Sequence, residues 1–241
     1  MQKTVRMKLS ALSGLLSGVT WTIGDILLVG FEPDLADYPE IAQSAVIQNK
    51  ELAVLMLEGS TRRLTAGALI AAFTIPLMFF ALYHISQLIK PSGQKYTALS
   101  ILLLFIGFSW SPLAHASFFY VGETYKTALL LDSASAGTVF ALGETFVQVL
   151  TITWAAAVGL TAVGWLLVTI AILRGKTAFP RVFGLFTPLS MTLIVGVLTP
   201  LLPSALSVPL TGADFNLAAI VFYVLTSIFV FRQTAGTDHS R

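Results

Sequence analysis

Six long apolar runs divide the sequence, and the shorter stretches between them hold most of the charged residues. A membrane-spanning helix needs about 20 consecutive apolar residues. The runs are continuous, whereas a lipid-facing barrel strand alternates between apolar and polar positions. We therefore predict an all-α polytopic membrane helix bundle with six transmembrane helices, at about residues 9–31, 64–88, 96–121, 147–173, 182–202 and 215–231.

Composition agrees with this pattern and excludes several classes of function. Of the 241 residues, 56% are hydrophobic and 11% are charged, against about 25% charged in an average soluble protein. We predict one integral-membrane domain over residues 1–241. The net charge of +2 and the lack of a dense basic patch exclude a nucleic-acid partner. The absence of cysteine excludes disulfides and thiol chemistry.

The basic residues predict the orientation of the bundle. With the N-terminus inside, ten of the fourteen Lys and Arg residues fall on the inner side, among them Arg6, Lys90 and Arg174. Because cytoplasmic loops are enriched in Lys and Arg, both termini are expected in the cytoplasm. The first apolar run follows basic residues but continues to Phe31 without a cleavage site, so we expect a retained span and not a removed signal peptide.

The outer loops are expected to contain helices. Residues 41–58 and 127–143 each combine apolar positions with polar ends. Ser60 is placed to cap the second span, and Asp132 and Ser133 are typical of a turn or cap. This elaboration predicts that a pocket would open on the outer face.

Two ionisable side chains, Asp25 and His115, are predicted to meet inside the membrane. Each lies about six residues from the outer end of its span, and so about 9 Å deep. A carboxylate within a span costs about 2.5–3.5 kcal/mol, so Asp25 must face the bundle interior and find partners. We predict a direct or water-bridged contact between the first and third spans at these two residues.

The surrounding polar residues suggest a pocket. Trp21 lies one turn from Asp25, and Ser111 lies one turn from His115. We interpret Asp25 and His115 as acid–base residues, with ligand contacts from Trp21, Trp110, Ser111, Glu123, Glu144 and Gln148. The alternative is a polar network that only fixes helix packing. Interhelical hydrogen bonds average about 0.6 kcal/mol, which makes such a network a costly source of stability.

Other polar or small residues are expected to be structural. His84 lies near the cytoplasmic end of the second span, where we expect an interfacial histidine whose ring reaches toward water. Gly14 and Gly18 form a small-residue packing face. Zinc usually needs three converging ligands, and the histidines lack the spacing of a metal motif. We therefore predict no metal and no cofactor.

Three stretches carry a family resemblance: Thr20–Gly30, Arg62–Gly67 and His115–Glu123. They resemble a family of small bacterial integral membrane proteins that is known only as a domain of unknown function. The resemblance covers most of the chain and implies a multi-pass protein of the bacterial cytoplasmic (inner) membrane without an assigned activity. A looser analogy links the carboxylate, histidine and tryptophan to the emopamil-binding sterol-isomerase superfamily. It concerns chemistry alone, because that superfamily has fewer spans.

Three functional hypotheses remain open. The first is a membrane-embedded pocket that binds a small lipid-like or amphipathic molecule, with or without acid–base chemistry. The second is a proton-coupled transporter of small molecules, with Asp25 as proton carrier. The third is a membrane scaffold or interaction protein without a ligand. In all three cases membrane lipids are expected partners. A transporter needs a polar path past the midplane. The inner half of the first span offers only Ser and Gly, whereas Thr187, Ser190 and Thr192 of the fifth span keep the second hypothesis open.

Overall fold

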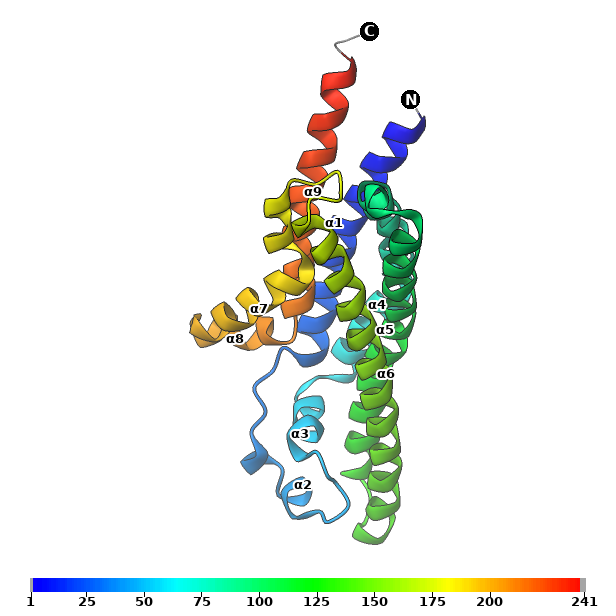
Figure 1. Ribbon diagram of the computed structural model, residues 1–241. Coiled ribbons are helices and arrows are strands. Elements are labelled where there is room, and N and C mark those ends of the chain that lie inside the picture. Colours follow the sequence, from blue (N-terminus) through cyan, green and yellow to red (C-terminus); the bar gives the residue numbers. More distant parts are fainter. Residues whose placement is uncertain (1, 239–241) are drawn as a thin grey trace.

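The computed structural model describes residues 2–238, with side chains from residue 4 to residue 232. All regular structure in this part of the chain is helical, which confirms the predicted all-α class (Figure 1). The long helices are α1 (Gln2–Val29), α4 (Thr61–Ile89), α5 (Gln94–Ala128), α6 (Ser133–Leu173) and α9 (Asp214–Asp238). The short helices are α2 (Pro39–Gln43), α3 (Lys50–Glu58), α7 (Pro188–Leu198) and α8 (Ser204–Thr211). Four 3₁₀ turns complete the order: η1 (Leu35–Asp37), η2 (Lys90–Ser92), η3 (Arg181–Phe186) and η4 (Thr199–Leu201).

Within the described residues, five helices are long and apolar enough to cross a membrane. They contain the predicted first, second, third, fourth and sixth spans, and their apolar segments run over Thr4–Val29, Thr61–Ser92, Gln94–Ala128, Ser133–Leu173 and Asp214–Arg232. Their side chains are packed on one side and exposed on the other, as in a bundle whose outer surface is itself apolar. Lipid is the solvent that such an outer surface suits.

The fifth predicted span is not a continuous helix. Residues 182–202 are divided among η3, α7 and η4, and prolines stand at the divisions, with Pro188 beginning α7 and Pro200 within η4. Proline lacks the backbone N–H that a continuing helix requires. The 11 residues of α7 extend about 16 Å, which is short of the roughly 30 Å hydrocarbon layer.

The two segments predicted to form loop helices differ from the sequence-based expectation. Residues 127–143 do not form a separate helix, because α5 continues to Ala128 and α6 already begins at Ser133. Residues 41–58 are divided into α2 and α3. The predicted caps are confirmed: the Ser60 side chain accepts a hydrogen bond from Arg63 N, and Asp132 accepts from the backbone at the start of α6.

Small residues let the long helices pack closely. α5 lies along α6, while α1 packs between α4 and α9 (Figure 1). A side chain at Gly14 would overlap the Tyr223 ring, and one at Gly18 would lie 2.8 Å from Ile220. The predicted packing face of the first span is therefore confirmed, and it meets α9.

His84 is buried in the helix bundle, so the expectation of an interfacial histidine is wrong. Its side chain is 0% exposed. The ring nitrogens lie 3.3 Å from Ser10 Oγ and 3.3 Å from Thr226 Oγ1, and its backbone N–H donates to Ser10 Oγ. The expectation fails because side chains of α1 and α9, including Ser10, Thr226 and Tyr223, surround the His84 ring.

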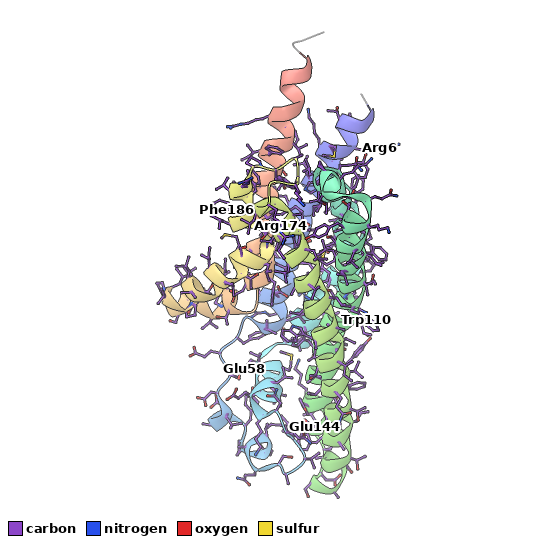
Figure 2. The ribbon with its side chains drawn as sticks, in the orientation of Figure 1. Arg6, Glu58, Trp110, Glu144, Arg174 and Phe186 are labelled. Atoms are coloured by element: carbon purple, nitrogen blue, oxygen red, sulfur yellow. The ribbon has the colours of Figure 1, made fainter. Side chains whose placement is uncertain are left out.

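Charge is unevenly distributed along the bundle. Figure 2 places Arg6 and Arg174 at the end where α1 begins and α9 ends, whereas Glu58 and Glu144 lie toward the opposite end. The acidic end also carries α2 and α3, which pack with the extended ends of α5 and α6 around a second apolar cluster that contains Met56.

Candidate functional site

The three sequence stretches that carry the family resemblance meet at one place. Gly24 and Gly67 let α1 and α4 approach closely, since a Cβ built at Gly67 would lie 3.0 Å from the Gly24 carbonyl oxygen. Arg63 Nη2 donates to Ile26 O at 2.5 Å and closes the end of α1. Thr61 Oγ1 donates to Glu123 at 2.9 Å and joins α4 to α5. These contacts fix the C-terminal end of α1, where Asp25 lies.

Asp25 and His115 form a direct contact across α1 and α5. His115 Nε2 lies 3.3 Å from Asp25 Oδ1, and the two side chains are 11% and 12% exposed. This confirms the predicted contact between the first and third spans. Asn216 of α9 completes the group, because its Nδ2 donates to Asp25 Oδ2 at 2.6 Å. Both carboxylate oxygens of Asp25 are thus held, each by a different helix.

Two polar atoms beside this group have no partner. His115 Nδ1 and Trp21 Nε1 are buried without a hydrogen-bond partner among the described residues. The two rings contact each other edge to face, with centroids 4.5 Å apart. A buried polar atom without a partner costs about 1–3 kcal/mol, so the arrangement has a cost that helix packing alone does not explain.

A cavity of about 760 Å³ lies against these side chains. Asp25, His115, Trp21 and Ser111 line it, together with residues from α6, α7 and α9. Three of its lining residues are also exposed at the molecular surface: Trp154 of α6 at 48%, Leu193 of α7 at 71% and Phe215 of α9 at 47%. The cavity is therefore reached from the side of the bundle, near the short helix α7.

The other predicted site residues lie elsewhere. Glu144 and Gln148 line a separate groove of about 800 Å³ with residues Gln48 to Glu51, and Glu144 accepts a hydrogen bond from the Tyr125 hydroxyl at 2.6 Å. Glu123 pairs with Lys126 at 2.8 Å. Trp110 is 42% exposed (Figure 2) and lines neither hollow. The structure thus separates the eight predicted residues, and it brings Trp21, Asp25, Ser111 and His115 together.

The sequence-based site omits several residues that the structure adds. Asn216 and Asp214 begin α9, and both line the cavity, as does Thr192 of α7. Asn216 and Tyr223 are seven residues apart, which is about two helical turns, so the two side chains lie on the same face of the helix. A polar stripe of this kind in an apolar helix is typical of a face that is turned toward the bundle interior. That signal shows that Asn216 faces inward, but it does not show which helix it faces.

The geometry suits proton transfer at His115. A carboxylate bonded to one imidazole nitrogen orients the ring and fixes which nitrogen carries the proton, and the second nitrogen is then free to exchange a proton with a bound group. Here Asp25 occupies Nε2, and Nδ1 is the nitrogen without a partner. Among the described residues, no three His, Asp or Glu side chains converge in a way that would hold a metal ion.

Comparison with known proteins gives a family and no function. The chain belongs to a family of unknown function (DUF6796), whose model matches residues 1–233. No curated protein and no solved structure matches the chain.

Proposed function

We propose that this protein is a membrane-embedded binding protein for a small amphipathic, lipid-like molecule, and that Asp25 and His115 exchange a proton with the molecule's polar end. One observation carries the proposal. A cavity of about 760 Å³, within the size range of small-molecule sites, contains a paired carboxylate and imidazole and two buried polar atoms without partners.

The lining favours an amphipathic ligand. Most of the cavity surface comes from aliphatic and aromatic side chains, while Asp25, His115 and Trp21 supply polar atoms at one place. A ligand with an apolar body would lie against the former, and its polar end would satisfy Trp21 Nε1 and His115 Nδ1. The exposed lining residues Trp154 and Leu193 belong to α6 and α7, so we expect a molecule dissolved in the membrane to enter between these two helices.

A membrane orientation is part of the proposal. Five full passes would leave the chain ends on opposite faces, yet α1 begins and α9 ends at the same end of the molecule (Figure 1). This supports a sixth pass made by α7, η4 and α8. The excess of Lys and Arg on the side of the two termini favours the cytoplasm of a bacterial cell for that side. Because the chain has no cysteine, Asp37→Cys and Gln94→Cys give single labelling sites. In intact cells, an impermeant thiol reagent should label Asp37→Cys and leave Gln94→Cys unlabelled; the reverse pattern contradicts the orientation.

The binding proposal is tested by filling the cavity. A Cβ added at Gly196 meets only Asp214 Oδ2, at 3.6 Å, so Gly196→Phe should fit and occupy the space. Gly159→Phe is the matched control, because nothing lies within 4 Å of a Cβ there and the residue is outside the cavity. Each protein is purified in lipid nanodiscs, and native mass spectrometry identifies retained membrane lipids. Retention by the unmodified chain and by Gly159→Phe, with loss in Gly196→Phe, supports the proposal. Equal retention in all three, or none in any, contradicts it.

A proton-coupled transporter is the second candidate, and the broken helix favours it. Interrupted spanning helices mark the substrate site in many transporters, and α7 contributes Thr192 and Gly196 to the cavity wall. Transport would require the cavity to open alternately to both sides of the membrane. Proteoliposomes that accumulate a cavity ligand in response to an imposed pH gradient would establish this candidate over simple binding.

A further inference from the structure

The acidic side chains of the cavity have almost no basic counterpart. Asp25 and Asp214 both line it, and among the described residues the lining contains no Lys or Arg. His115 is the one nitrogen base in that lining, and it already contacts Asp25. A cavity with this balance attracts positive charge and repels negative charge.

Asp214 is the acid that is left without a basic partner. Its Oδ1 accepts a hydrogen bond from Thr199 Oγ1 at 3.1 Å, and its Oδ2 lies toward Gly196 across the cavity wall. Within the part of the chain whose side chains are described, the ion pairs are His115–Asp25 and Lys126–Glu123. Asp214 is half-buried at the start of α9, and among the described side chains no Lys, Arg or His forms an ion pair with it.

Aromatic side chains form much of the remaining wall. Seven of them line the cavity, including Trp154, Trp165 and Phe215. The faces of aromatic rings attract cations, and the attraction is stronger where water is excluded. The same rings also bind the apolar groups of an organic ion.

We infer that the cavity selects lipophilic cations: organic amines in their protonated, ammonium form, whose charge pairs with Asp214 and whose apolar groups lie against the aromatic wall. This inference rests on the proposed function and names the class of ligand for the same cavity. A neutral or anionic amphiphile of the same shape would fit the volume, but it would leave Asp214 without a counter-charge.

The experiment compares three probes of similar size and different charge. They are tetraphenylphosphonium (a cation), triphenylphosphine oxide (neutral) and tetraphenylborate (an anion). The full chain is reconstituted in nanodiscs, and binding is measured by equilibrium dialysis against empty nanodiscs, which correct for partition into lipid. We expect tetraphenylphosphonium to bind at least about tenfold more tightly than the neutral probe, a difference that one favourable charge contact supplies.

Two variants assign the selectivity to Asp214. Asp214→Asn keeps the shape and the contact with Thr199, and it should lower tetraphenylphosphonium affinity about tenfold while leaving triphenylphosphine oxide affinity unchanged. Glu32→Gln is the control, because it removes the same charge from an exposed position outside the cavity, and it should change neither affinity.

Failure of this inference is distinguishable from failure of the proposed function. If the neutral probe or tetraphenylborate binds as tightly as the cation, or if Asp214→Asn weakens all three probes equally, the charge selectivity is wrong while the binding cavity stands. If no probe binds and no membrane lipid is retained by the chain, both are wrong.

Discussion

Two buried histidines in one bundle show how differently the same side chain can be used. His84 is packed on every side, and both ring nitrogens lie within hydrogen-bond distance of hydroxyl groups of α1 and α9. His115 is buried to a similar degree, but it pairs with a carboxylate, leaves Nδ1 without a partner and lines a cavity. The two sites differ in whether the ring nitrogens have hydrogen-bond partners. A polar network that only fixes packing, as at His84, uses its hydrogen-bond donors and acceptors within the protein. The group around His115 leaves two polar atoms, Trp21 Nε1 and His115 Nδ1, without a partner.

The comparison also separates two layers of the bundle. Around His84, α1, α4 and α9 converge, and Ser10 of α1 and Thr226 of α9 lie against the two sides of its fully buried ring. Around His115, the polar partners come from α1, α5 and α9. Residues of α6 and α7 line the cavity beside this group. Stability should therefore depend mainly on the first layer and ligand binding mainly on the second.

The largest expected effect on stability is that of His84→Ala. The substitution opens a void in a filled layer, and large-to-small changes of this kind cost about 2–5 kcal/mol. We expect a clearly lower melting temperature in detergent, with lipid retention unchanged in the protein that remains folded. A His84→Ala protein that keeps its melting temperature but loses its lipid would reverse the roles given to the two histidines.

His115→Ala should have a smaller effect on stability and a larger effect on binding. The side chain already faces a cavity, so its removal adds little new void, and the main cost is about 1–2 kcal/mol for the lost contact with Asp25. We expect lipid retention to be lost. In a double-mutant cycle with Asp25→Ala, the two losses of stability should be less than additive by about 0.5 kcal/mol or more; strictly additive losses would mean that the two side chains do not interact.

Much of this arrangement can be predicted from the sequence, because lipid imposes simple rules. Long apolar runs predict helices, and the cost of a buried carboxylate predicts that Asp25 finds a partner at the depth of His115. Depth alone leaves the rotation of each helix about its axis undetermined. Glu144 and Gln148 share a helix face, but that face lies toward residues 48–51 and not toward the cavity. The burial of His84 and the part played by Asn216 depend on where α9 returns through the bundle, a long-range feature that periodicity does not contain.

The interruption of the fifth predicted span at α7 also cannot be predicted from hydropathy alone. Residues 182–202 are as apolar as a spanning helix, and only the prolines indicate that the segment ends early. Proline is tolerated within spanning helices elsewhere in this chain, as at Pro76 of α4 and Pro112 of α5. A proline alone therefore does not distinguish a kink from an end. What distinguishes them here is the 3₁₀ geometry on both sides of α7.

Asp25→Asn distinguishes packing from proton chemistry within the His115 layer. The amide keeps the shape of the carboxylate and can still bond to His115 and Asn216, so we expect a change in stability below about 1 kcal/mol. It cannot carry a proton or a charge, so exchange with the ligand should stop. The measurement is lipid retention as a function of pH: dependence on pH in the unmodified chain should disappear in Asp25→Asn. If the variant keeps the same pH profile, Asp25 is part of the packing and the acid–base role is wrong.

Substitution of Asp132 should have the smallest effect on stability and binding. Asp132 is an exposed carboxylate outside both layers, so it shows what a carboxylate contributes where water reaches it. Hydrogen bonds from the backbone and side chain of Ser135 hold the pKa of Asp132 below its usual value, so its capping of α6 is present near neutral pH and is lost as the pH falls through that lowered pKa. Asp132→Ala should therefore increase hydrogen exchange at the first amides of α6 at pH 7, with little change in melting temperature and unchanged lipid retention. In strong acid the variant and the unmodified chain should exchange alike at these amides. A loss of lipid retention in Asp132→Ala would show that the N-terminal end of α6 is coupled to the cavity, and the separation of the molecule into independent layers would then be wrong.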